Sequence, residues 1–101
     1  MKMYRQGDVL LIERGQLPEE VQKQKECILA YGEATGHHHQ VKEHGVIWID
    51  INDQGRRYLE IVADTKLVHE EHAPLALKGP AVFEVIIQKE YFPGAIRNVI
   101  D

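Results

Sequence analysis

The apolar residues of this chain fall into short runs separated by glycine, proline, asparagine and aspartate. This pattern is typical of strands joined by turns, and it favours an all-β sandwich or barrel. Residues 46–51 are rich in β-branched side chains, and residues 57–62 alternate between two faces. Strands are expected over residues 9–12, 27–31, 46–51, 57–62, 65–69 and 81–91, and the last is the longest.

The segments between these strands are expected to be less regular. Residues 18–25 begin with proline and two glutamates, which suits the first turn of a short helix, although a solvated loop fits nearly as well. Asn52-Asp53-Gln54-Gly55 has the composition of a hairpin turn. Residues 95–101 follow Pro93-Gly94 as a tail expected to pack on the barrel. The pattern therefore predicts one small barrel or sandwich domain over residues 1–101, with at most one short helix.

Composition narrows the classes of partner. At 101 residues, with 44% hydrophobic and 28% charged residues, the chain is long enough for one modest core. Its formal charge is −4 and its basic residues are spread thinly, so no nucleic-acid partner is expected. The lone cysteine, Cys27, excludes an intrachain disulfide and fits a reducing compartment. It lies in an apolar run, where an inert buried thiol is expected.

The sequence carries no signal for export or membrane insertion. The first eight residues contain no apolar core of a signal peptide. The longest apolar runs have four or five residues, whereas a membrane-spanning helix needs about 20. We therefore expect a cytoplasmic protein without a membrane partner. Exposed edge strands would also allow a homodimer.

The candidate chemistry of the chain is concentrated in histidine. Five of the six histidines form two short clusters, Gly36-His37-His38-His39 and His69-Glu70-Glu71-His72. Imidazole and carboxylate are the usual ligands of borderline divalent metals. The two clusters can meet if the chain between them folds back as a hairpin, so the sequence predicts a metal site.

Strand parity selects among the residues of the first cluster. Side chains two residues apart share a face of a strand, so His37 and His39 are expected to point together while His38 points away. Glu43 returns to the face of His39 if the strand continues that far. His44 lies beside Gly45 at an apparent turn, and neither it nor His38 is expected to be a ligand.

The second cluster differs from the helical metalloprotease motif, in which two histidines lie four residues apart on one helix. Here His69 and His72 are three apart, and Pro74 disfavours a helix through this segment. A strand end that turns into a loop can still direct both histidines inward. Glu70 or Glu71 would then bind the metal, orient a histidine or serve as the general base. The alternative is an ordinary solvated surface that binds metal adventitiously.

The stretch from Gly32 to Glu43 is similar to the first motif of the cupin family, in which glycine is followed by His-x-His and then a glutamate. The resemblance implies a cupin-like, metal-binding barrel. The spacing from Gly32 to His37 is one residue shorter than in that motif. The second cupin motif has no counterpart here, although His69 or His72 could supply its histidine.

More of the chain resembles a family of small, poorly characterised proteins of bacteria and their phages. Its members carry an Arg-Gln-Gly-Asp-Val opening, a Gly-Glu-x-Thr-Gly-His-x-His block, a His-x-Glu-His-x-Pro block, a Gln-x-Glu-Tyr segment and a Val-x-Asp tail. The corresponding positions here are residues 5–9, 32–39, 69–74, 88–91 and 99–101. The resemblance implies a domain built around both histidine blocks, with no settled activity.

We therefore expect a divalent-metal site whose ligands come from His37, His39, His69, His72 and Glu43. Nitrogen and oxygen ligands without thiolate favour zinc, with manganese, iron or nickel as alternatives. Glu70 or Glu71 is the expected catalytic group, and the default reaction is hydrolysis of a small molecule by a metal-activated water. The alternatives are a non-catalytic module stabilised by metal, and a regulatory or phage accessory protein.

Overall fold

The computed structural model describes residues 2–31, 38–53, 55–92 and 95–98, and within these it contains strands and turns but no helix. One antiparallel sheet has the order β1 (Met3–Gln6), β2 (Val9–Arg14), β10 (Ala81–Ile87), β7 (Arg57–Ile61), β6 (Gly45–Asp50) and β3 (Val21–Lys23). A second has the order β4 (Ile28–Tyr31), β5 (His38–Val41), β8 (Thr65–Val68) and β9 (Leu75–Leu77). Strands β11 (Lys89–Phe92) and β12 (Ala95–Asn98) form a separate hairpin.

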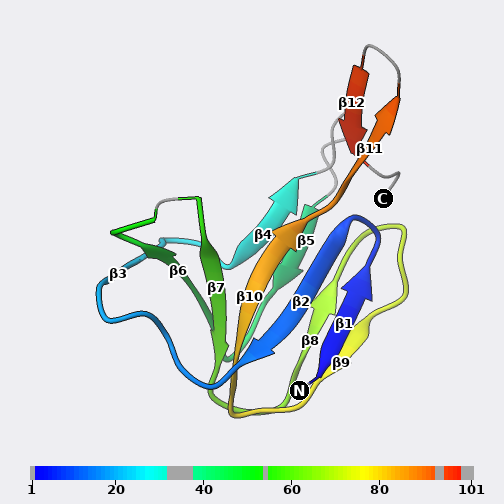
Figure 1. The fold of residues 1–101 in the computed structure, drawn as a ribbon. Coiled ribbons are helices and arrows are strands. Elements are labelled where there is room, and N and C mark those ends of the chain that lie inside the picture. The colour runs from blue at the N-terminus through cyan, green and yellow to red at the C-terminus, as the bar shows by residue number, and fades with distance from the viewer. Residues whose placement is uncertain (1, 32–37, 54, 93–94, 99–101) are drawn as a thin grey trace.

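The two larger sheets form a sandwich and do not close into a barrel (Figure 1). Side chains alternate along each strand, so each sheet turns one apolar face toward the other. All-β architecture is confirmed, and of the two predicted arrangements the sandwich is the one observed. The buried core is Val9, Leu11, Leu29, Val41, Ile47, Leu59, Ile61, Leu67, Leu77, Phe83 and Val85. No helix in the described part of the chain is long and apolar enough to cross a membrane.

The strands expected around residues 9–12, 27–31, 46–51, 57–62 and 65–69 are confirmed as β2, β4, β6, β7 and β8, with ends that differ by one or two residues. The helix considered for residues 18–25 is wrong, because this segment contains β3. Its backbone pairs with β6, and Gln24 N–H donates to the Ile47 carbonyl at 2.8 Å. Pairing satisfies backbone groups that the edge of β6 would otherwise expose.

The C-terminal segment also differs from the prediction. The long strand expected over residues 81–91 is divided into β10 and β11, with Gln88 between them. The expected tail contains β12, which pairs with β11 in the register Lys89↔Asn98. This hairpin extends beyond the end of β10 (Figure 1). Cross-strand hydrogen bonding thus replaces the expected packing of a tail on the body.

One tight turn sets the end of the sandwich where polar residues gather. Gln6 pairs with Val9, so β1 and β2 are joined by the two-residue turn Gly7-Asp8. Gly7 has a φ of 56°, a left-handed conformation that is open to glycine because it has no Cβ. The turn expected at His44 lies at the opposite end, where Gly45 pairs with Ile61 and Ile61 with Ala81. His44 has a φ of 66° and a side chain that is 48% exposed.

The lone thiol lies where the core meets the connection from β3 to β4. Cys27 is half-buried and packs against the apolar core. Burial raises the pKa of its thiol from 9.0 to about 11. Almost none of the thiol is ionised at neutral pH, and the thiolate is the nucleophile. Cys27 is therefore an unreactive packing residue, as expected from its apolar surroundings in the sequence.

Gly79 is expected to tolerate no side chain. A Cβ at this position would lie 2.6 Å from the carbonyl oxygen of Ala63 and 2.7 Å from the carbonyl carbon. Backbone cannot move aside as a flexible side chain can, so Gly79→Ala should lower the free energy of unfolding by about 1–3 kcal/mol. Urea unfolding measures the change. Gly15→Ala is the matched control, because a Cβ there meets nothing within 4 Å, and equal midpoints for the two variants would contradict the prediction.

Candidate functional site

Three histidines and one aspartate meet at the end of the sandwich formed by the β1–β2 turn and the β8–β9 loop. His39 lies on β5, and His69 and His72 lie in the loop from β8 to β9. Asp8 lies in the β1–β2 turn, which belongs to the opposite sheet. We call these four residues the histidine–aspartate cluster. Each sheet supplies part of it, so the cluster depends on the sandwich being assembled.

Strand alternation explains why His39 enters the interior and its neighbour does not. On β5, His39 and Val41 are buried whereas His38 and Gln40 are half-exposed. The side chain of His39 is 0% exposed. The prediction that His38 and His39 point to opposite faces is confirmed. His37 lies outside the described residues, so its role as a ligand stays a prediction.

Gln6 fixes both the orientation and the tautomer of His39. Its amide nitrogen donates to the carbonyl oxygens of Leu67 and Ala73, each at 3.0 Å. This leaves the amide oxygen of Gln6 facing Nδ1 of His39 at 2.8 Å. Because a carbonyl oxygen only accepts hydrogen bonds, Nδ1 carries the proton and donates it. In neutral His39, Nε2 is therefore the nitrogen with the lone pair.

The lone-pair nitrogen of His39 faces a buried carboxylate. Nε2 of His39 lies 3.2 Å from Oδ1 of Asp8, whose side chain is 1% exposed. Asp8 is held in place by the hairpin turn, and its carbonyl accepts a hydrogen bond from Gln88 N–H at 2.8 Å. A neutral imidazole nitrogen and a carboxylate oxygen are both acceptors, so their close approach requires a positive charge. Either a proton or a metal ion can supply it.

The other two histidines pack beside this pair. The ring centroid of His69 lies 4.4 Å from that of His39 and 4.7 Å from that of His72. The backbone N–H of Glu71 donates to Nδ1 of His69 at 3.0 Å, so neutral His69 carries its proton on Nε2. Nε2 of His72 is buried and has no hydrogen-bond partner among the described residues. Loss of hydrogen bonding in a buried polar atom is unfavourable unless a ligand compensates for it.

The predicted carboxylates lie outside this interior cluster. Glu43 was expected to share the face of His39, but β5 ends at Val41 and parity is lost beyond it. The Glu43 side chain is 80% exposed and its carboxylate lies 3.8 Å from His44. Glu70 is exposed, and its carboxylate accepts a hydrogen bond from His38 N–H at 3.0 Å. Glu71 is exposed too, and its backbone contacts His69.

Sequence reasoning did not assign a role to Gln6 or Asp8. Both lie in the Arg5-Gln6-Gly7-Asp8-Val9 opening that carries part of the family resemblance. Gly7 between them predicts a turn, and two polar residues at a turn are ordinarily solvated. Here they are buried, with 5% and 1% of their surfaces exposed. Their burial inside the sandwich marks them as functional candidates, and burial cannot be read from the sequence alone.

The donor atoms of the cluster are close together but do not yet enclose a metal position. Among the described residues, no group of three or more histidine, cysteine or acidic side chains has the arrangement of a metal site. The rings of His39 and His72 are stacked, with centroids 6.0 Å apart and planes 17° apart. His72 lies in the loop from β8 to β9 and not in a strand.

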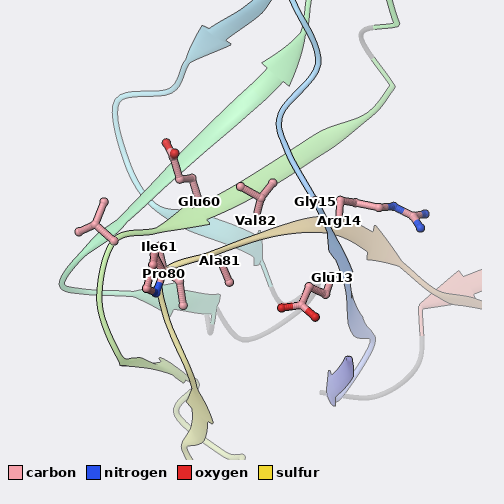
Figure 2. A pocket seen from close by; sticks show the side chains of 9 residues that line it. Glu13, Arg14, Gly15, Glu60, Ile61, Pro80, Ala81 and Val82 are labelled. Carbon is pink, nitrogen blue, oxygen red and sulfur yellow. The ribbon is translucent and has the colours of Figure 1, made fainter. Parts of the chain in front are cut away.

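Hollows on the surface differ in their relation to the cluster. One hollow, of about 590 Å³, lies at the Arg14 end of β2, far along the strand from Asp8. Its lining side chains do not converge, because Glu60 and Val82 point away from Glu13 and Ala81 (Figure 2). A hollow of about 320 Å³ lies beside the cluster and includes His69 in its lining. The smaller hollow is therefore the one placed to serve the cluster.

A family model described as a domain of unknown function (DUF8820) matches residues 5–88. The chain belongs to the DUF8820 family. The matched region contains Gln6, Asp8 and the three histidines of the cluster. No curated protein and no solved structure matches the chain. Membership in DUF8820 agrees with the expected resemblance to an uncharacterised family, whereas the cupin resemblance stays a prediction.

Proposed function

We propose that this DUF8820 protein binds one divalent metal ion between its two sheets and uses it to hydrolyse a small molecule. The ligands are Nε2 of His39, Nε2 of His72 and the carboxylate of Asp8. Two imidazoles and one carboxylate form a ligand set found in catalytic zinc sites, where a water or substrate takes the remaining position. Zinc is the first choice, and iron, manganese and nickel accept the same ligands.

The observation that carries the proposal is the approach of His39 to Asp8. In a tetrahedral site with bonds of about 2.0–2.1 Å, two ligand atoms lie about 3.3–3.4 Å apart. Nε2 of His39 and Oδ1 of Asp8 are 3.2 Å apart, and both side chains are almost fully buried. The amide oxygen of Gln6 accepts a hydrogen bond from Nδ1–H of His39, and this directs the Nε2 lone pair to this position. An outer partner of this kind accompanies most metal-binding histidines.

Gln6 also supports the loop that would complete the site. Its amide nitrogen bonds to carbonyls on either side of the segment that holds His69 and His72. These bonds fix the two ends of the loop. His72 lies between those ends and belongs to no strand. His72 in this loop is the residue proposed to add the third ligand atom, because its buried Nε2 has no hydrogen-bond partner among the described residues.

His69 is suited to proton transfer in this arrangement. Its Nδ1 accepts a backbone hydrogen bond, so its Nε2 is protonated in the neutral ring. A protonated Nε2 donates to a leaving group more readily than it binds a metal. Glu70, which lines the hollow that also includes His69, remains the predicted second proton carrier. A metal held by His39, His72 and Asp8 would supply activation of water, since such an ion lowers the pKa of a coordinated water to about 7.

Cobalt titration tests the proposal, because bound Co²⁺ absorbs visible light with an intensity that reports its coordination. The expected result is saturation at about one ion per chain, as for a single tetrahedral or five-coordinate site. His72→Ala should weaken binding by more than the roughly 10–100-fold typical of outer-shell changes. His44→Asn is the control, because His44 is exposed and asparagine tolerates its φ of 66°. Equal affinity in the two variants would contradict the proposal.

The second candidate is a metal site without catalysis, and the firm attachment of the cluster favours it. His39 is fully buried, and Gln6 fastens it to both ends of the loop. A closed site with four protein ligands would support this alternative, whereas an open position would support hydrolysis. Addition of azide to the cobalt-loaded protein distinguishes them, because azide changes the spectrum only where a solvent molecule can be replaced.

A further inference from the structure

The hollow beside the cluster runs along the outer face of β5 and β8. Its volume is about 320 Å³, and its lining is His38, Gln40, Lys42, Val68, His69 and Glu70. His38 and Gln40 are alternate residues of β5 and so share one face, and Lys42 follows the end of the strand at Val41. Val68 pairs with Gln40 across the sheet. Since His69 belongs to both the hollow and the cluster, a ligand in the hollow would lie next to the proposed centre.

The two ends of the hollow differ in chemistry. At one end, the carboxylate of Glu70 accepts a hydrogen bond from His38 N–H at 3.0 Å. Glu70 directly follows His69 in the sequence, so this is the end next to the cluster. At the other end lies Lys42, four residues along from His38. At about 3.3 Å per residue, the strand from His38 to Val41, the residue before Lys42, spans about 10 Å. The hollow therefore has room for a small extended molecule with distinct ends.

The Lys42 end presents hydrogen-bond donors. Nε2 of His38 lies 3.3 Å from the amide oxygen of Gln40, which can only accept, so the ring donates. The amide nitrogen of Gln40 is left as a donor with no partner among the described residues. The ammonium group of Lys42 likewise forms no ion pair within the part of the chain that the structure describes. Two adjacent donors, one of them charged, match the oxygens of an anion.

We propose that this hollow is the substrate subsite and that it takes a small molecule ending in an oxyanion, a carboxylate or a phosphate. Lys42 and Gln40 hold the oxyanion, Val68 contacts the middle of the molecule, and the reacting group lies beside His69. The inference rests on the proposed function for the reaction at the far end. Binding of the oxyanion itself needs only the outer face of the sheet.

Amide NMR titrations of the protein as purified test the subsite, with sodium acetate and sodium phosphate as probes at constant ionic strength. Saturable shifts are expected at the Gln40 side-chain amide and the Lys42 backbone amide. Lys42→Met should weaken binding of the probe at least about tenfold, as expected for loss of a charged hydrogen bond. Lys78→Met is the matched control, because Lys78 is also exposed but lies after β9, outside the hollow.

The result assigns the ligand class and separates the two proposals. A response to acetate alone identifies a carboxylate, and a response to phosphate alone identifies a phosphate. Shifts that do not saturate, or equal affinity in wild type and Lys42→Met, would overturn the subsite. Because the titration follows residues outside the metal ligands, oxyanion binding by a protein that fails to bind cobalt would retain the subsite and reject the metal function. Cobalt binding without oxyanion binding would retain the metal function and reject the subsite.

Discussion

Gln6→Leu should destabilise the fold by about 3–5 kcal/mol, because each buried polar group left without its partner costs about 1–3 kcal/mol. Leucine has nearly the volume of glutamine but no polar atoms. It would leave Nδ1 of His39 and the carbonyls of Leu67 and Ala73 without the bonds that Gln6 now makes. A domain of this size is stabilised by about 5–15 kcal/mol in total, so the loss is severe. Urea unfolding followed by circular dichroism measures it.

Gln16→Leu is the matched control for this substitution. Gln16 is exposed in the connection from β2 to β3, so the same change of side chain should alter stability by less than about 0.5 kcal/mol. If Gln6→Leu unfolds at the same urea concentration as Gln16→Leu, Gln6 does not join the two sheets as described. A change in the slope of the transition would instead indicate an altered unfolded or native state.

Zinc should raise the melting temperature strongly, and removal of zinc should lower it. At a free zinc concentration about a thousandfold above Kd, binding to the native state alone adds about 4 kcal/mol. For a domain of about 100 residues this corresponds to a rise in Tm of roughly 15–30 °C. Differential scanning calorimetry with added zinc, and then with excess chelator, measures both values.

His72→Ala should abolish most of this rise. His72 is half-buried in a loop outside the strands, so the zinc-free variant should still fold. His44→Asn should keep the full response, because His44 is exposed and lies outside the cluster. A Tm that zinc and chelator leave unchanged in the wild type would contradict the predicted metal site. An equal rise in wild type and His72→Ala would place the metal elsewhere.

Local patterns in the sequence predicted the strands that carry a clear apolar run or alternation. β2 and β6 contain continuous apolar runs, and β7 alternates between two faces. Both patterns are set by residues within each strand, so they could be recognised without knowledge of the fold. The three-residue strand β3 contains too little pattern for that. It forms because the edge of β6 offers backbone partners, which is a property of the assembled sheet.

The candidate site could likewise be predicted only where a local strand pattern determined the direction of a side chain. Strand parity predicted that His38 and His39 face opposite ways, and the structure buries His39 and leaves His38 half-exposed. The same parity failed for Glu43, because it assumed a strand that in fact ends at Val41. Asp8 could not be predicted from its residue type or its neighbours. Its role comes from a hairpin turn of one sheet that lies against a strand of the other.

Metal content of the untagged protein, purified without added metal, is the most direct test of the proposed centre. Elemental analysis should find about one divalent ion per chain, zinc above the others, as for a single mononuclear site. The same preparation of Asp8→Asn should contain far less, because the buried carboxylate opposite His39 has lost its charge. Metal far below one ion per chain in the wild type, together with equal content in Asp8→Asn, would contradict a metal centre at the histidine–aspartate cluster.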